Sequence, residues 1–213
     1  MPITSTGAWT KNYEAIKRYW AANISPVSSQ SFGSILNEAG VALYYVDREY
    51  NTAKLPIAYL TSGTYQTDSS NGRTIMLVLG GEQSGGTPSE TDYAIWGPIR
   101  NTSGENYLSY RNVTNTPLTP GLDGDGNYVS GMRSSVTIQN MADNAITVYE
   151  YGLFTGLRAT TTNSSSSSAY SSHQVLLYRG VLSEPVTLGR WDTITINLDR
   201  YIKVALQESG TTP

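Results

Sequence analysis

Residues 173–206, HQVLLYRGVLSEPVTLGRWDTITINLDRYIKVAL, carry the clearest structural pattern in this 213-residue chain. An apolar run at 175–182 is interrupted by SEP at 183–185, and a second extended run follows at 191–206. Within the second run, the letters TITINL at 193–198 alternate polar and apolar residues. A period of two is typical of a strand with one buried face. The stretch therefore predicts β-strands.

Short apolar runs separated by turn residues continue this pattern upstream. We predict strands at residues 41–46, 57–60, 73–79, 93–96, 106–112, 132–139 and 145–151. The last two are expected to pair through a turn at 141–144, and 116–127 is expected to be a turn-rich insertion. Because the strands do not alternate with helices, an antiparallel arrangement is favoured over a parallel sheet. The predicted fold class is all-β, an antiparallel β-sandwich of jelly-roll type.

One helix is expected, near the amino terminus. Trp9, Tyr13, Ile16 and Trp20 recur at spacings of four, three and four, which places them on one face of an amphipathic helix. Thr10 is a suitable cap for its first turn. Two roles remain open for the apolar face: it covers a sheet of its own subunit, or it docks on a neighbouring subunit.

The helix and the strands suggest two parts of unequal size. We predict an N-terminal helical arm at residues 1–40 and a β-sandwich domain at residues 41–213. A chain of 213 residues is long enough for a substantial core without disulfides or metals.

Charged residues are scarce. They make up 15% of the chain, against about 25% in ordinary globular domains, and the formal net charge is −3. The absence of a basic cluster argues against a nucleic-acid partner. No signal peptide is expected, and no apolar run reaches the ~20 residues needed to span a bilayer, so no membrane partner is expected. A surface with few charges suits contact with other proteins, since fewer charges need desolvating.

The residues that usually carry metal or nucleophilic chemistry are nearly missing. There is no cysteine, and the single histidine, His173, follows a serine run at 164–168 without a G-x-S-x-G motif. The letters DGDGN at 123–127 resemble the start of a calcium loop. However, Tyr128 occupies the sixth position, where glycine is needed, and Ser134 the twelfth, where glutamate is needed. We expect no metal and no cofactor.

Paired carboxylates are the remaining route to catalysis. Glu150 lies in a predicted strand, and Asp192 or Asp199 is available as an acidic partner for glycoside hydrolysis. Acidic residues at strand ends are more often solvated. We therefore predict that the protein is not an enzyme and has no catalytic residues, with a hydrolase using Glu150 as the least favoured alternative.

Aromatic bulk is carried by tyrosine, with 16 Tyr against 2 Phe. Tyrosine is favoured where one side of the ring is packed and the other meets water or a partner. Tyrosine and tryptophan also stack on sugars, so a protein contact and a carbohydrate-binding surface both remain open. The predicted interface residues are Trp9, Tyr13, Ile16, Trp20, Tyr149, Tyr151, Tyr178 and Trp191.

The last third of the chain resembles the closing strands of small structural proteins of tailed bacteriophages. The resemblance is carried by YEYGLF at 149–154, LLYRGVL at 176–182, PVTL at 185–188 and DTITI at 192–196. It implies a virion component, such as a head decoration, a neck or collar subunit, or a tail-associated protein. Its implied partners are other virion proteins and copies of itself, as a homo-oligomer in the virion. The alternative is a carbohydrate- or receptor-binding module of a phage particle.

Overall fold

The computed structural model describes residues 5–21, 35–44, 75–83, 86–99, 108–122, 124, 128–162 and 170–204. Eight strands and one helix lie within these ranges. In chain order they are β1 (Ser5–Trp9), α1 (Lys11–Ala21), β2 (Ile75–Gly80), β3 (Pro98–Ile99), β4 (Leu108–Leu122), β5 (Tyr128–Asn140), β6 (Ile146–Ala159), β7 (Ser171–Leu188) and β8 (Thr193–Val204).

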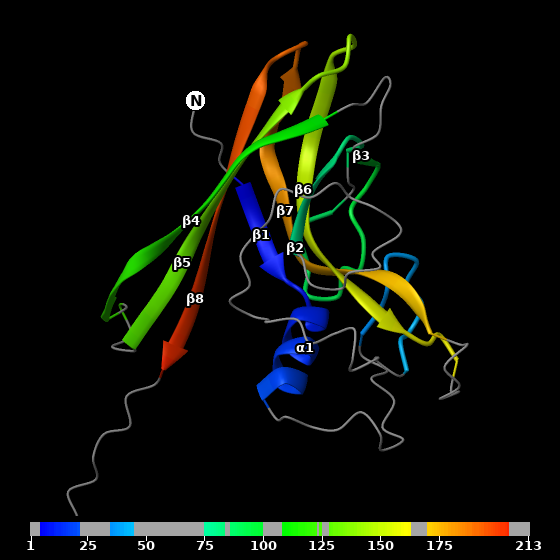
Figure 1. Cartoon of the computed structure of the whole chain (residues 1–213), viewed down its shortest axis with the longest axis vertical. Helices are drawn as coiled ribbons and strands as arrows, with labels where there is room; N and C mark the ends of the chain where they lie inside the picture. Colours follow the sequence, from blue (N-terminus) through cyan, green and yellow to red (C-terminus); the bar gives the residue numbers. More distant parts are fainter. Residues whose placement is uncertain are drawn as a thin grey trace, which may run out of the picture.

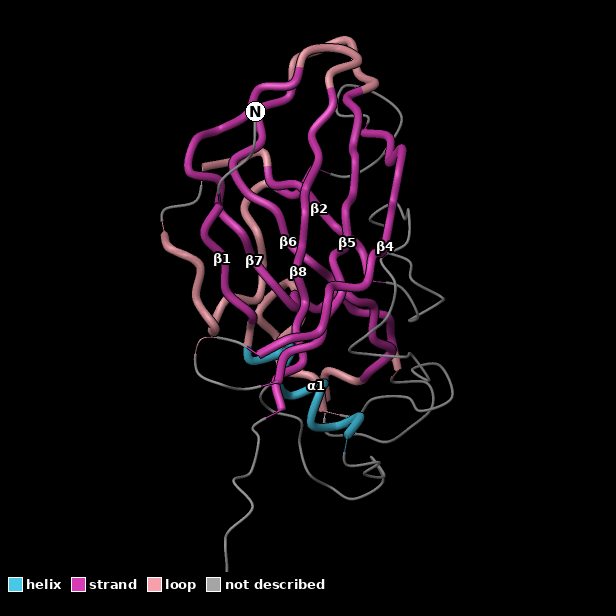
Figure 2. Tube along the Cα trace, turned by 90° about the vertical axis from the view of Figure 1, so that its left-hand side faces the viewer, coloured by secondary structure: helices cyan, strands magenta, loops and turns pink. Residues whose placement is uncertain are grey.

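The strands form two antiparallel sheets (Figure 1). The larger sheet has the order β1-β7-β6-β2-β3, and the smaller has the order β4-β5-β8. Figure 2 looks through the smaller sheet toward the larger, with β1 and β8 on the same side of the molecule. The predicted all-β, antiparallel class is confirmed, while the jelly-roll arrangement in particular stays a prediction.

The faces that the two sheets turn toward each other share one hydrophobic core. Alternate residues of β5 and β8 are buried there against residues of β2, β6 and β7. Full burial of one such side chain contributes about 1.5–3 kcal/mol, so this core holds the sheets together without disulfides. Its most buried members include Leu77, Leu79, Ile138, Leu153, Leu157, Val175, Leu177 and Ile194.

The predicted pairing of 132–139 with 145–151 is wrong. β5 pairs with β4 and β8, whereas β6 pairs with β2 and β7, so the connection between them crosses from one sheet to the other. Asn140 holds this corner: its amide nitrogen donates to the carbonyls of Asn144 and Leu188, both at 2.9 Å, and its amide oxygen accepts the Ala142 N–H. The alternation of polar and apolar residues identifies a strand but not its partner. It therefore cannot distinguish a hairpin from a connection that crosses between sheets.

The predicted insertion at 116–127 is also wrong over its first half, since β4 continues to Leu122. Pro117 and Pro120 led to the turn prediction, but β4 is an edge strand, and an edge tolerates residues that donate no ladder hydrogen bond. A register shift between Leu118 and Gly121 absorbs the irregularity. In contrast, residues 93–96 form no strand.

The helix begins directly after the predicted cap, Thr10, but Trp9 lies outside it. Trp9 is the last residue of β1, and α1 begins at Lys11 with Thr10 between them; the Tyr13 N–H lies 3.4 Å from the Thr10 hydroxyl. β1 pairs with 178–182 of β7, so residues 5–9 of the predicted arm belong to the larger sheet. How the arm and the sandwich domain divide elsewhere stays a prediction.

Several predicted elements lie wholly or largely outside the described residues: the strand at 57–60, the serine run at 164–168 and most of 123–127. Residues 41–44 form no strand, only an isolated bridge from Ala42 to Leu36.

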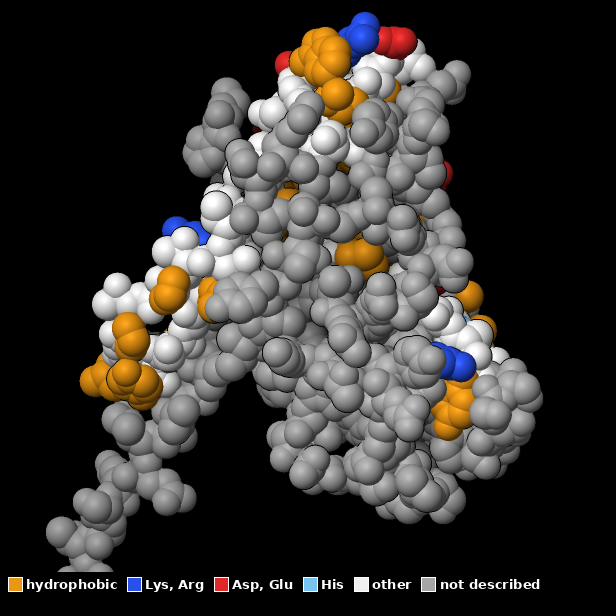
Figure 3. Space-filling model, viewed as in Figure 1, with side chains coloured by type: hydrophobic (Ala, Val, Ile, Leu, Met, Phe, Trp, Pro, Cys, Tyr) orange, Lys and Arg blue, Asp and Glu red, His pale blue; other side chains and the backbone are white. Residues whose placement is uncertain are grey.

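One end of the smaller sheet projects beyond the core. Along β5, Ser134, Val136, Ile138 and Asn140 are buried, whereas residues 128–133 are exposed or half-buried. Figure 1 shows the two sheets diverging toward this end. We call the projecting part, residues 116–122, 128–133 and 199–204, the ribbon. Figure 3 shows hydrophobic side chains gathered on it.

Candidate functional site

Four of the predicted interface residues meet in one aromatic cluster: Trp9, Tyr13, Tyr151 and Tyr178. The ring centroids of Trp9 and Tyr13 are 4.3 Å apart, those of Trp9 and Tyr178 are 5.0 Å apart, and those of Tyr151 and Tyr178 are 6.0 Å apart. The four residues come from β1, α1, β6 and β7. The pairing of β1 with β7 therefore assembles the cluster, by placing Trp9 opposite Tyr178.

Two glycines make room for the tyrosine rings. A Cβ on Gly7 would overlap the Tyr178 hydroxyl, and a Cβ on Gly180 would overlap the Tyr151 ring. The rings therefore lie along the sheet surface, and the Tyr151 hydroxyl is 2.9 Å from the hydroxyl of Ser5. Burial, and then the neighbouring Tyr151, raise the pKa of Tyr178 well above its ordinary value. The Tyr178 hydroxyl therefore stays protonated at physiological pH.

The cluster is anchored on one side and open on the other. Tyr151 and the nearby Ile16 are buried, while Trp9, Tyr13 and Tyr178 are half-buried and pack against the edge of the main core. Figures 1 and 2 place β1 on the same side of the sandwich as β8. The larger sheet extends beyond the smaller one here, which leaves the outer part of the cluster only partly covered.

The other predicted interface residues lie elsewhere. Trp191 is exposed in the turn between β7 and β8, at φ 71°, with the Arg190 guanidinium 4.9 Å from its ring centroid. Tyr149 is half-buried on β6. The side chain of Trp20 lies outside the described residues. That these eight residues form an interface stays a prediction.

A second exposed feature is the outer edge of β8, the last strand of the smaller sheet. Asn140 N–H donates to the Asp192 carbonyl at 2.9 Å, so Asp192 turns its carbonyl toward β5, while the Asn140 carbonyl accepts from Trp191 N–H at 2.8 Å. Hydrogen-bonded and non-hydrogen-bonded pairs alternate along an antiparallel ladder. Ile194 and Ile196 consequently bond to β5, while the N–H and C=O groups of the odd-numbered residues point outward.

The side chains agree with this alternation of hydrogen-bonded and non-hydrogen-bonded pairs. Thr137 and Thr195 are opposite each other, with their hydroxyls 2.9 Å apart, as expected for the closer side chains of a non-hydrogen-bonded pair. Thr193, Thr195 and Asn197 thus present backbone groups to the outside. Among the strands that the structure describes, none pairs with this edge.

The sheet edges differ in how open they are. β3 has two residues and β1 five, and β4 carries two prolines and two register shifts. β8 has 12 residues, no proline, and an unbroken register with β5 from Thr193 to Val204. Natural sheets usually block such edges with short strands, prolines, bulges or charges. Of the described edges, β8 is the long regular one, and its charged residues, Asp199, Arg200 and Lys203, lie in its second half.

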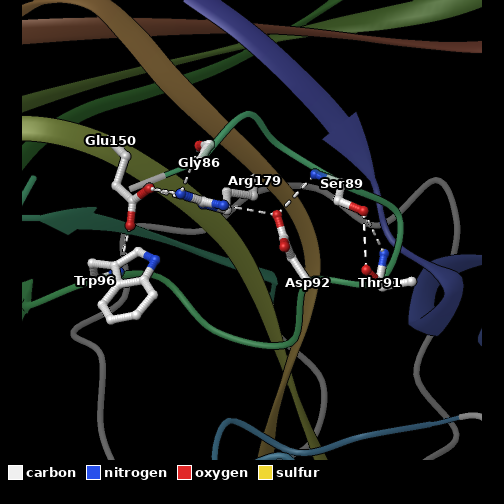
Figure 4. Close-up of polar contacts among 7 residues, drawn as sticks. All are labelled: Gly86, Ser89, Thr91, Asp92, Trp96, Glu150 and Arg179. Atoms are coloured by element: carbon white, nitrogen blue, oxygen red, sulfur yellow. Dashed lines mark hydrogen bonds and ion pairs between the residues drawn. The ribbon is translucent and has the colours of Figure 1, made fainter. Parts of the chain in front are cut away.

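A polar network is buried at the face of the larger sheet that points away from the smaller sheet (Figure 4). Glu150 on β6 and Arg179 on β7 form an ion pair, with Arg179 Nε 2.8 Å and Nη2 2.7 Å from Glu150 Oε2. Arg179 Nη1 contacts Asp92 at 2.9 Å, and the Gly86 carbonyl lies 3.5 Å from Nη2. Burial alone would lower the pKa of Arg179, but its bonds to Asp92 and Glu150 raise it above its ordinary value.

This network fastens the 86–97 loop to the sheet. Glu150 accepts the N–H of Trp96, and Asp92 accepts the N–H of Ser89 at 2.9 Å. Ile95 packs beside the network in a small second core with Val78, Phe154 and Leu176. The site was missed at the sequence level, although a signal existed: a single charge of opposite sign lies inside each of two apolar strands, and buried charges are usually paired.

The network does not suit Glu150 to the glycosidase role. Its side chain is 0% exposed, and both oxygens accept hydrogen bonds. Neither Asp192 nor Asp199 is among its bonded partners; Asp192 accepts from Gly189 N–H, and Asp199 pairs with Arg133. A glycosidase needs two carboxyl groups that flank an accessible bond, and Glu150 is inaccessible.

His173 lies between Ser171 and Asn37 in an order that resembles a catalytic triad. Ser171 Oγ is 2.9 Å from Nε2, and Asn37 Nδ2 is 3.3 Å from Nδ1. Asn37 Oδ1 accepts the N–H groups of Ala39 and Val41, so its nitrogen must face the ring and donate to Nδ1. Burial lowers the pKa of His173, and the neutral ring then carries its proton on Nε2. That tautomer cannot accept the serine proton.

No group of three or more metal-ligating side chains occurs among the described residues. Within the same ranges, no helix is long and apolar enough to cross a membrane. Comparison with protein-family models, with curated proteins and with solved structures found no match.

Proposed function

We propose that this protein is a non-enzymatic structural component of a tailed-phage virion, present in many copies and acting through protein–protein contacts. A head decoration, a neck or collar subunit and a tail-associated subunit all fit this role. The proposal starts from the strand patterns that resemble phage structural proteins. It does not depend on any catalytic group.

The observation that carries the proposal is the open side of the sandwich. The smaller sheet has a 12-residue strand edge without proline or bulge, and the larger sheet carries a cluster of half-buried aromatic rings. Both features are typical of surfaces that other proteins cover, since open edges otherwise invite uncontrolled pairing. The low charge of the chain, 15%, reduces the desolvation cost of such contacts.

The test is the composition of purified particles. Particles from cultures that carry this coding sequence should contain the protein at a fixed ratio to the major capsid protein, measured by quantitative mass spectrometry after density-gradient purification. Negative-stain images with a specific antibody should then label one structural feature of the particle. Particles that lack the chain at every stage of purification would refute the proposal.

A second candidate is a carbohydrate- or receptor-binding module. Trp96 is 55% exposed, and Tyr93 is exposed on the same loop, which the Glu150–Arg179–Asp92 network holds rigidly. Exposed aromatic rings on a fixed loop suit stacking against a sugar. A glycan array with the wild-type protein and with Trp96→Ala tests this function: binding lost in the variant supports it, and an array without hits removes it.

A further inference from the structure

We infer that the contact between Asn37 and His173 is a pH-sensitive latch, which holds the turn at residues 37–41 against β7 near neutral pH and releases it on acidification. The inference goes beyond the proposed function and does not depend on it, because it concerns a contact within the subunit.

The side chain of Asn37 is fixed in one orientation. It is buried, and its Oδ1 atom accepts the N–H groups of Ala39 at 3.0 Å and Val41 at 2.9 Å. The backbone of the same turn is closed by the Asn37 N–H, which donates to the Val41 carbonyl at 3.0 Å, and by the Gly40 N–H, which donates to the Asn37 carbonyl at 2.8 Å. Turning the amide over would set its nitrogen against two N–H donors. Asn37 therefore offers only a donor, Nδ2, to the ring of His173.

This donor makes the contact depend on the charge of the ring. Asn37 Nδ2 lies 3.3 Å from His173 Nδ1, which can accept a hydrogen bond only while the ring is neutral. A second proton on the ring would occupy Nδ1 and place two donors opposite each other. On the other side of the ring, Nε2 lies 2.9 Å from the Ser171 hydroxyl, which can accept from the ring in either charge state. Protonation therefore opposes only the contact that joins His173 to the turn.

His173 is the group at this contact that titrates near neutral pH. Burial lowers its pKa, and a backbone hydrogen bond at Ala159 partly offsets this effect, so the lowered pKa comes from burial and not from a neighbouring charge. Arg158 is opposite Ser172 in the ladder, which places it on the other face of the sheet from His173. Among the described residues, the other titratable groups of the segments packed here are Glu38, Tyr44, Arg158 and Tyr170.

The lowered pKa sets the direction of the response. Because the pKa of His173 in the folded chain lies below its ordinary value of 6.5, the neutral contact stabilises the fold fully above pH 6.5. The stabilisation is lost as the pH falls from there through the folded pKa. Acidification thus weakens the hold on the turn.

The latch acts on a segment whose two ends are held independently. Ile35 and Leu43 are buried in the main core, with 1% and 0% exposed. Between them, the Glu38 N–H joins the turn to β7 by donating to the Gln174 carbonyl at 3.0 Å. Loss of the Asn37–His173 contact should therefore loosen the turn and leave the ends of the segment in place.

The turn in its own right supports the 86–97 loop. Gly40 has a φ of 74°, and a Cβ there would lie 3.1 Å from the ring of Tyr93, so this ring rests on the turn. Tyr93 and Trp96 are exposed on the loop, and the buried ion-pair network holds the loop to the sheet at Trp96. Release of the turn would remove the support under Tyr93 alone. The latch thus makes the position of one exposed aromatic residue depend on pH.

The titration of His173 tests the charge dependence of the contact. It is the single histidine of the chain, so one imidazole signal in a proton–carbon correlation spectrum reports it in a protein produced without a histidine tag. The wild-type ring should titrate below pH 6.5. Asn37→Asp supplies a carboxylate that accepts from the protonated ring, and it should raise the proton affinity of His173 at least about tenfold, as an adjacent opposite charge usually does. A wild-type ring that titrates at or above pH 6.5, or an unchanged titration in Asn37→Asp, would overturn the inference.

Amide hydrogen exchange tests whether the turn is released. Protection factors, which correct for the pH dependence of exchange itself, are compared near neutral pH and below the measured pKa of His173. On acidification the factor for the Glu38 N–H should fall at least about threefold. The factor for the Leu43 N–H, which donates to the Ile35 carbonyl at 3.0 Å within the segment, should not change.

His173→Asn is the matched variant for this measurement. Its side-chain oxygen can accept from Asn37 Nδ2, and it does not titrate, so the protection of the Glu38 N–H should no longer respond to pH. A wild-type Glu38 N–H that stays protected on acidification, or one that responds equally in His173→Asn, would refute the latch. The wild-type measurements decide the question by themselves should either variant fail to fold.

Discussion

Two arginine–carboxylate pairs of the same chemistry occupy opposite environments in this molecule. Arg179 and Glu150 are buried in the larger sheet, with side chains 4% and 0% exposed. Arg133 and Asp199 lie on the smaller sheet, where the ribbon begins, with side chains 53% and 26% exposed. The first pair fastens a loop to the body, whereas the second only neutralises a charge on a strand surface. The comparison indicates that the same ion-pair chemistry holds a loop in place where it is buried and contributes little where it is exposed.

The largest expected effect is the removal of one member of the buried pair. Arg179→Met leaves the carboxylate of Glu150 buried without its cationic partner, and breaking a buried pair in this way typically costs about 3–5 kcal/mol. Urea unfolding followed by tryptophan fluorescence measures the change. A loss below about 1 kcal/mol, the range of exposed pairs, would mean that the two pairs are equivalent.

A compensating change should recover part of that loss. Arg179→Met combined with Glu150→Gln removes both charges, and neutral replacement of a buried pair is often tolerated. We expect the double variant to be more stable than Arg179→Met alone, with a coupling free energy within the range of about 0.5–3 kcal/mol seen for residues in contact. Additive losses would show that the two side chains do not act as a pair.

The tight packing around Glu150 gives an intermediate effect. A Cβ on Gly80 would lie 2.7 Å from Glu150 Cγ and 2.7 Å from the Trp96 carbonyl oxygen. Gly80→Ala should therefore destabilise the fold by about 1–3 kcal/mol, as overpacking usually does. Gly86→Ala is the matched control, because nothing lies within 4 Å of a Cβ there. Thermal unfolding of both variants checks this, and equal melting temperatures would contradict it.

The smallest effect is expected at the exposed pair. Asp199→Asn should change the free energy of unfolding by less than about 1 kcal/mol, because exposed pairs are screened by solvent and salt. Raising the salt concentration should reduce this change in the free energy of unfolding further. A loss that approaches that of Arg179→Met would mean that the ribbon is held to the body more firmly than its exposure indicates.

The sequence was sufficient for the fold class and for several strands. Alternation at 193–198 correctly predicted β8, and the run at 175–182 lies within β7. Strand pairing was not predictable, because the corner at Asn140 depends on side-chain bonds to Asn144 and Leu188. Leu188 is distant in the sequence, and Asn144 belongs to no recognisable motif. Similarly, the prolines in β4 predict a turn from the sequence alone. They are compatible with a strand only because β4 lies at the edge of its sheet, a position that the sequence does not reveal.

The aromatic cluster was predictable only in part. The spacing of Trp9 and Tyr13 matched a helix, yet β1 ends at Trp9 and the helix begins after Thr10. Both residues still meet, because Thr10 also donates its hydroxyl to the Leu176 carbonyl at 2.7 Å and fixes the junction against β7. The meeting of Trp9 with Tyr178 follows from strand pairing over a long sequence separation, which no local pattern encodes.

The most direct test of the open β8 edge is amide hydrogen exchange of the full chain in dilute solution, read residue by residue. The amides of Ile194 and Ile196 should be protected, since they bond to β5. Those of Thr195 and Asn197 should exchange quickly, because none of the described strands pairs with this edge. Outward amides that are protected as strongly as the inward ones would contradict the account.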